Sequence, residues 1–180
     1  FTFSITEQGC WLGILLFAFN RGGVGEVGWV AVLLLLPAAV LAPLVAVASD
    51  AFPRHVVLTT GYALVAATAI GVGVAMLAEA PIQVIYGLAI VFSILLTFGG
   101  PTMAAIIPTA ATTADELTAA NTATGVVETA GRLVGPLLAG AILTVASPGA
   151  VLVWIGGLMT LGAMGTVGRA PDSPGFNGRH

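Results

Sequence analysis

Two charged residues that could carry protons or bind a solute lie inside an otherwise apolar stretch of the sequence. Glu128 and Arg132 are four residues apart, so on a helix they share a face and can pair. An ionised side chain at the bilayer centre costs about 2.5–3.5 kcal/mol, so such residues mark substrate or proton pathways by default. Glu7 lies in the first apolar stretch. We take these three as candidate pathway residues; for Glu128 and Arg132, a pair that only fixes helix packing is an equal alternative.

The chemistry of such a pathway depends on the environment of its carboxylates. A carboxyl group in a low-dielectric site can bind and release a proton near neutral pH. That property makes Glu128 the first candidate for a proton carrier and Glu7 the second. Arg132 opposes this role, because a neighbouring positive charge favours the ionised carboxylate. A locked ion pair between Glu128 and Arg132 is therefore the second interpretation.

The composition identifies the solvent around these charges. The chain has 180 residues, of which 58% are hydrophobic and 7% are charged, and its mean hydropathy is +1.07. Soluble domains carry about 25% charged residues, so this chain could not cover a water-facing surface. We therefore predict an all-α integral membrane protein. The net charge of −3 provides no basic field that would favour nucleic acid.

Residues that would support other chemistry are sparse. Cys10 is the single cysteine, and His55 and His180 are far apart, so no metal-ligand spacing exists. No nucleophile is paired with a base and no loop is built to cradle phosphate, so the sequence predicts neither an enzyme nor a cofactor site. The chain begins with Phe1 and has no signal-peptide pattern, so we expect its true start to lie upstream.

Apolar windows long enough to cross a bilayer follow one another closely. A spanning helix needs about 20 mostly apolar residues, and six windows meet this need. They cover residues 3–20, 27–48, 56–78 and 82–107, a fifth window that follows Asn121 and reaches 146, and a sixth that follows Gly149 and ends near 168. We predict a transmembrane domain over residues 1–168 and a polar, disordered tail over residues 169–180.

Charge in the loops predicts the orientation. Six spans place both termini on one side, and the loops and tail on that side would hold Arg54, His55, Arg169 and Arg179. The opposite loops would hold only Arg21. The positive-inside rule therefore predicts a multi-pass protein of the inner (plasma) membrane with both termini in the cytoplasm.

Glycine and proline are concentrated in the fifth window, in the stretch GRLVGPLLAG. Helices in lipid associate by close backbone approach at small residues. Gly131, Gly135 and Gly140 would form a smooth packing strip, and Pro136 would bend the helix beside it. Just before this window, Thr113 followed by Glu116 fits a capping box at a helix start.

The loop SDAFPRH lies between the second and third windows. It places Asp50 and Arg54 at the membrane edge, close enough to pair. An ordinary turn, with Pro53 as the helix breaker and Arg54 as an orienting charge, explains the same residues.

Together these motifs resemble the amino-terminal half of a major facilitator superfamily transporter. That family has a cytoplasmic signature between helices two and three, roughly G-x-L-x-D-R-x-G-R-R. The stretch AVASDAFPRH is similar to it, with Asp50 and Arg54 at the key acidic and basic positions, and with Ala51 and Pro53 in place of the first arginine and second glycine.

The resemblance extends to helix five. Proton-coupled exporters of the family carry G-x-x-x-G-P-x-x-G-G there, and GRLVGPLLAG is similar at Gly131, Gly135, Pro136 and Gly140. A further stretch resembles bacterial exporters, including actinobacterial ones, in its proline-ended helix four and its L-x-x-A-N sequence. The matching positions are Pro101, Pro108, Leu117, Ala120 and Asn121.

The resemblance implies one half of a two-lobed transporter, with six transmembrane helices in two inverted three-helix repeats. It implies alternating access, a gating loop at Asp50 and Arg54, and proton-coupled efflux (antiport) of a small amphipathic or hydrophobic solute. The implied partners are the lipid bilayer, the solute, H⁺ and a C-terminal six-helix half outside this sequence. The alternatives are a transport-inactive scaffold or sensor, which the altered loop signature favours, and a small oligomeric pore packed through the glycine strip.

Overall fold

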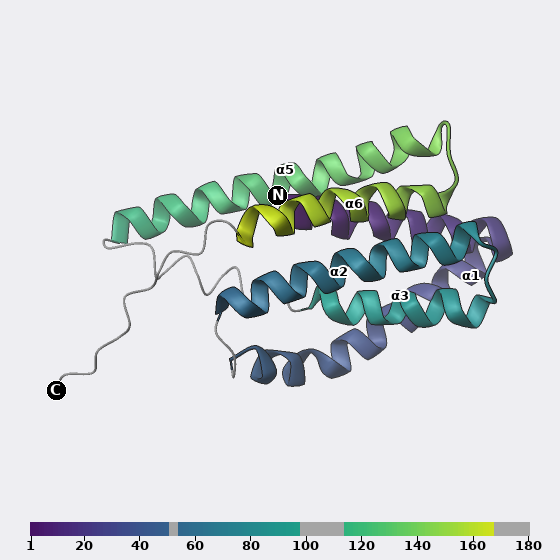
Figure 1. Cartoon of the computed structure of the whole chain (residues 1–180), viewed down its shortest axis with the longest axis horizontal. Helices are drawn as coiled ribbons and strands as arrows, with labels where there is room; N and C mark the ends of the chain where they lie inside the picture. The colour runs from purple at the N-terminus through teal and green to yellow at the C-terminus, as the bar shows by residue number, and fades with distance from the viewer. Residues whose placement is uncertain (51–53, 98–113, 168–180) are drawn as a thin grey trace.

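The apolar runs of the chain form helices, which satisfy every backbone polar group internally and are therefore suited to lipid. The structure is a computed structural model that describes residues 1–50, 54–97 and 114–167. Within these ranges there are five helices. They are α1 (Thr2–Asp50), α2 (Arg54–Leu77), α3 (Ile82–Leu96), α5 (Ala114–Leu143) and α6 (Pro148–Val167). Figure 1 shows them lying lengthwise beside one another in an elongated bundle.

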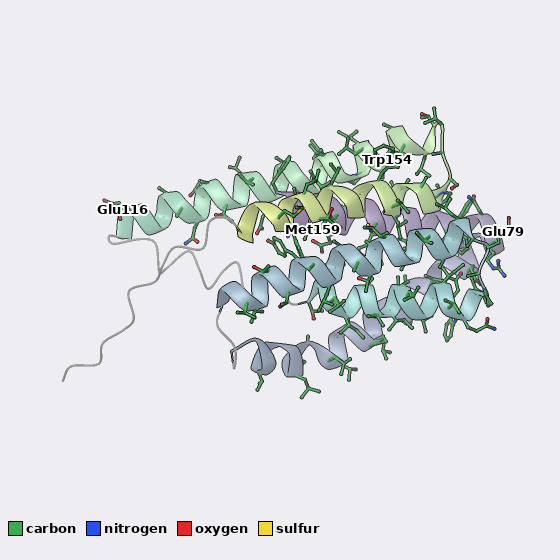
Figure 2. The ribbon with its side chains drawn as sticks, in the orientation of Figure 1. Glu79, Glu116, Trp154 and Met159 are labelled. Atoms are coloured by element: carbon green, nitrogen blue, oxygen red, sulfur yellow. The ribbon has the colours of Figure 1, made fainter. Side chains whose placement is uncertain are left out.

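The lengths and composition of these helices fit an all-α membrane protein, as the composition predicts. In the described part of the chain, three apolar helical segments are long enough to cross a membrane, namely Thr2–Leu44, Thr59–Leu77 and Thr118–Leu143. Ile82–Leu96 and Pro148–Gly162 are shorter apolar helices. Figure 2 places the acidic residues Glu79 and Glu116 at opposite ends of the bundle. The described residues thus contain five helices, where the sequence led us to expect six.

The difference arises in α1, which reverses direction without a loop. Gly22 (φ −140°, ψ 16°) and Gly23 (φ 65°, ψ −153°) are non-helical, and the chain is helical on both sides of them. The sequence predicts a polar loop between residues 20 and 27. Instead these two glycines make the turn, and Gly23 adopts a backbone conformation that is essentially restricted to glycine. We call residues 2–21 the first arm and residues 24–50 the second arm; Figure 1 shows α1 reaching one end of the bundle and returning.

The turn between α2 and α3 ends at Pro81, a residue type that is favoured at helix starts. Glu79 has a positive φ of 52°, and the Ala80 N–H donates to the Ala75 carbonyl at 2.9 Å. This is the Schellman arrangement that caps helix ends. Pro81 is the N-cap of α3. The expected end of this helix near residue 107 lies outside the described residues.

Helix α5 begins ahead of the apolar window, at the position that the capping-box pattern predicts for a helix start. It starts at Ala114, and the segment that follows contains good helix formers such as alanine, leucine and glutamate. Thr113 lies outside the described residues, so the expected capping box is described only at Glu116, which is exposed. Figure 1 shows the first turns of α5 extending beyond the neighbouring helices.

The core is centred on α6, where glycines let helices approach closely. A Cβ atom on Gly73 of α2 would lie 2.6 Å from the Gly149 carbonyl oxygen of α6, and a Cβ on Gly149 would lie 2.8 Å from the Gly73 carbonyl oxygen. On another side of α6, Gly9 and Gly13 of the first arm face isoleucine and leucine side chains. Met159 is fully buried and lies where α6 faces α2 (Figure 2), whereas Trp154 is 68% exposed.

Candidate functional site

Helix α5 is fixed to the first arm of α1 by two glycines from the predicted strip. A Cβ on Gly131 would lie 2.8 Å from Ser4 Cβ, and a Cβ on Gly135 would lie 2.8 Å from the Ile5 carbonyl oxygen and 3.1 Å from Gln8 Cβ. No larger residue fits at either position without moving the first arm. The contact sets the register of α5 against α1.

The strip continues through Ala139 and not through Gly140. Ala139 is fully buried, whereas a Cβ on Gly140 would meet no atom within 4 Å. Steps of four residues stay on one face of a helix, and a step of five leaves it. Pro136 is half-buried and lies within α5, which is helical on both sides of it.

A polar face runs along α5 beside the glycine strip. Seven residues share about one third of the helix circumference, and all are exposed except Glu128, which is half-buried. They are Thr118, Asn121, Thr122, Gly125, Glu128, Thr129 and Arg132. On the side of α5 opposite the glycine strip, Val126, Leu133 and Leu137 are 64%, 68% and 65% exposed. A membrane helix with one apolar and one polar exposed face is expected to meet lipid on the first and water or protein on the second.

The threonines of the polar face are partly satisfied within the helix. Thr122 Oγ1 donates to the Thr118 carbonyl at 2.8 Å, and Thr129 Oγ1 donates to the Gly125 carbonyl at 2.8 Å. Such back-bonded threonines are tolerated in lipid. Asn121 and Arg132 have more polar atoms than backbone carbonyls of their own helix can satisfy, so these two residues indicate contact with water or protein.

The three predicted pathway residues come together from two helices. Glu7 of the first arm is half-buried, and both Arg132 and Glu128 of α5 are close enough to act on it electrostatically. Among the described residues, no ion pair holds Glu128 or Arg132. We call Glu7, Glu128 and Arg132 the charged cluster. Whether its residues lie on a transport pathway stays a prediction.

Tyr62 of α2 adds an aromatic group near the charged cluster. Its ring stacks on Phe3 of the first arm, with centroids 5.7 Å apart and planes at 21°. Glu128 is close enough to act electrostatically on the Tyr62 hydroxyl. The available signal was the position of Tyr62 inside an apolar window, on the same residue row as buried Val65 and Ala69.

A second polar contact, which the sequence analysis did not predict, joins the second arm to α3. The Tyr86 hydroxyl donates to Glu26 Oε1 at 2.8 Å, and the Glu26 side chain folds over Gly22, where a Cβ would lie 2.7 Å from Glu26 Cβ. Further along, Ser93 Oγ donates to the Leu34 carbonyl at 3.0 Å. Such long-range pairs cannot be inferred from spacing along the chain.

The predicted gating loop lies mostly outside the described residues. Asp50 ends α1 and Arg54 begins α2, but residues 51–53 and the side chains of Asp50 and Arg54 are not described. Their pairing therefore stays a prediction.

Comparisons with known protein families, curated proteins and solved structures found no match to this chain. Its function must be inferred from its own residues.

Proposed function

We propose that this chain is one lobe of a secondary active transporter of the major facilitator type, with six spans when the arms of α1 are counted separately. The contacts between helices support spans whose directions alternate along the chain. Ser4 and Ile5 pack in parallel order on Gly131 and Gly135, and Glu26 and Leu34 pair in parallel order with Tyr86 and Ser93. Gly9 and Gly13 face α6 in antiparallel order.

The helix pairs also support two inverted three-helix repeats. In such an arrangement the first arm, second arm and α2 exchange with α3, α5 and α6. The contact of the first arm with α5 then corresponds to that of α3 with the second arm, and both exist. The contact of the first arm with α6 corresponds to that of α3 with α2, and both exist. The exchange swaps α2 with α6, so the contact between these two helices corresponds to itself, and it also exists.

The observation that carries the functional proposal is the charged cluster beside an exposed polar face. Glu7 and Arg132 lie on two helices whose backbones pack closely. Helix packing therefore fixes the positions of both residues at a modest cost in free energy. In this proposal a second six-helix lobe covers the polar face, and the solute passes between the lobes. Glu128 carries the proton, Glu7 is the second carboxylate, and Arg132 is their counter-charge.

The activity that fits these groups is proton-coupled efflux of a small amphipathic or hydrophobic solute, without enzymatic chemistry. The lobe lies in the inner (plasma) membrane with both termini in the cytoplasm, and Asp50 and Arg54 belong to a gating loop at that surface. The binding partners are the bilayer, the solute, H⁺ and the second lobe.

The test compares Glu128→Gln with Glu79→Gln in the transporter that contains this chain, reconstituted in liposomes. Glu79 is exposed in the α2–α3 turn, away from the cluster. A pH gradient should drive efflux of a lipophilic dye in the unmodified protein and in Glu79→Gln, and Glu128→Gln should abolish the coupling. Unchanged coupling in Glu128→Gln would remove it as the carrier. Gradient-independent ion currents would indicate a pore, and dye binding without flux would indicate a scaffold or sensor.

A further inference from the structure

Two prolines lie inside the second arm of α1, and each removes a backbone donor there. Pro37 and Pro43 are both within the helical part of the arm. A proline in a helix interior leaves the carbonyl four residues earlier without its donor, and the ring crowds that carbonyl. For Pro37 this carbonyl belongs to Leu33. Sharp bends in long helices almost always occur at such positions, and Figure 1 shows the second arm changing direction before its last turns.

A hydrogen bond from α3 meets the second arm at the next carbonyl along the chain. Ser93 Oγ donates to the Leu34 carbonyl oxygen at 3.0 Å, and both residues are buried. In a straight helix this carbonyl accepts from the Ala38 N–H. A carbonyl oxygen has two acceptor positions, so the Ser93 hydroxyl keeps it satisfied when bending at Pro37 draws the Ala38 N–H away. Hydroxyl groups of neighbouring side chains make such bends tolerable in lipid.

The packing of the second arm also changes at Pro37. Before and at this turn, Val30, Leu34 and Ala38 form one buried row with a spacing of four residues. Beyond Ala38, none of the described side chains of the arm is buried, and Val47 is 72% exposed. The core therefore holds the part of the arm before the proline, whereas the part after it can move without opening the core.

We propose that Pro37 is a hinge at which residues 39–50, which we call the end segment, pivot against the rest of the bundle. Ser93 makes the bent arrangement accessible, because its hydroxyl satisfies the Leu34 carbonyl. A hinge requires a few residues that absorb a change of backbone angle between a fixed part and a free part. The end segment leads to Asp50. Movement of the predicted gating loop by this hinge rests on the proposed function, whereas the hinge itself does not.

Distances between pairs of spin labels, measured by pulsed electron paramagnetic resonance on the whole chain in lipid nanodiscs, test the hinge. In a Cys10→Ala background, one label is attached at Leu161→Cys of α6. The other is attached at Val47→Cys, beyond the hinge, or at Val32→Cys, before it; all three native side chains are exposed. The distance distribution from Val47 should be the broader of the two. Equal widths at the two positions would overturn the proposal.

Pro37→Ala supplies the missing N–H and should straighten the arm. Val47 lies ten residues beyond Pro37, about 15 Å along a helix. Removal of a bend of about 20° should therefore move Val47 by about 5 Å and narrow its distance distribution. Pro43→Ala is the matched control, because it lies only four residues before Val47 and should move it by about 2 Å. No change in Pro37→Ala, or equal changes in the two variants, would overturn the hinge.

Ser93→Ala tests the role of the hydroxyl. Bending then leaves the Leu34 carbonyl unsatisfied, so the bent population seen from Val47 should fall about fivefold or more. Thr68→Val is the control, because the Thr68 hydroxyl donates to the Leu64 carbonyl of its own helix at 2.8 Å and its loss should leave the distribution unchanged. Equal effects of Ser93→Ala and Thr68→Val would overturn the role of Ser93. None of these measurements involves transport, so failure of the dye-efflux test would refute the proposed function and leave the hinge standing.

Discussion

The α2–α6 and α1–α5 interfaces both pack through glycines, but they bury different amounts of the helices. At the α2–α6 interface, Gly73 and Gly149 face each other across the contact, each opposite the other's carbonyl oxygen, and apolar side chains such as Val72 and Met159 are fully buried around them. At the α1–α5 interface only one row of α5, through Gly131, Gly135 and Ala139, is buried. The rest of α5 is largely exposed.

The difference shows what a glycine row makes possible in lipid. Burial of apolar surface contributes little to the association of helices in lipid, so contacts between closely approaching backbones hold the helices together. Between α2 and α6 this produces a rigid core. Between α1 and α5 it anchors a helix along one narrow row, which leaves the adjacent row free for Asn121, Glu128 and Arg132. The charged cluster can therefore exist on a helix whose attachment needs no polar contact.

The largest expected effect is at the α2–α6 interface. Gly73→Ala places a methyl group 2.6 Å from the Gly149 carbonyl oxygen and 2.9 Å from the Val153 nitrogen. Two backbones must separate, so we expect a loss of about 3 kcal/mol in the free energy of unfolding, at the upper end for overpacking. Thermal unfolding in nanodiscs measures it. Gly71→Ala is the control, since its Cβ meets nothing within 4 Å; equal losses at both sites would show that this contact is not a close one.

A smaller loss is expected at the α1–α5 interface. Gly135→Ala meets the Ile5 carbonyl oxygen at 2.8 Å, but the strain can relax by displacement of α5, which has few other attachments. We expect about 2 kcal/mol, together with faster amide hydrogen exchange in α5. Gly140→Ala should be neutral or slightly stabilising, because alanine favours helix. If Gly140→Ala proved the more damaging substitution, the buried row would have been assigned to the wrong residues.

The polar face can be distinguished from the apolar face by labelling. In a Cys10→Ala background, Asn121→Cys and Thr129→Cys should react about tenfold faster with a membrane-impermeant thiol reagent than Val126→Cys and Leu137→Cys, because the reactive thiolate requires water. The measurement is the labelling rate in liposomes that contain the protein. Equal labelling rates on both faces would mean that α5 does not border a water-filled pathway.

The smallest effect is expected at the contact between the second arm and α3. Tyr86→Phe removes the hydrogen bond to Glu26 and should cost about 1 kcal/mol of stability, without changing dye efflux. Chemical unfolding of Tyr86→Phe, Glu26→Leu and the double variant measures the coupling between them. Additive losses would contradict a direct contact, and a loss of efflux would extend the functional region beyond α5 and the first arm.

Features encoded by local chemistry could be predicted from the sequence, and those that depend on helix register could not. The apolar composition predicted a helical membrane protein, and Pro81 marked the start of α3. The spacing of Glu128 and Arg132 placed them on one helix face. In contrast, the proximity of Glu7 to Arg132 depends on how far the first arm slides along α5, which the contacts of Gly131 and Gly135 decide. The choice of Ala139 over Gly140 depends on the same register.

Two other features were missed for related reasons. The bond between Tyr86 and Glu26 joins residues 60 positions apart, so no local pattern indicates it. The polar residues around Gly22 and Gly23 suggested a loop, yet the non-helical backbone of these two glycines gives the reversal. The site could thus be predicted as three residue types, while its assembly, including Tyr62, required the three-dimensional arrangement.

The backbone angles of Gly23 have a consequence for how the chain is threaded through the bilayer. A straight helix of the 49 residues of α1 would be about 74 Å long, more than twice the roughly 30 Å thickness of the hydrocarbon layer. Without the reversal, one arm would have to leave the lipid with its leucines and valines in water. The two residues without side chains therefore let both apolar arms of α1 fit within one hydrocarbon layer.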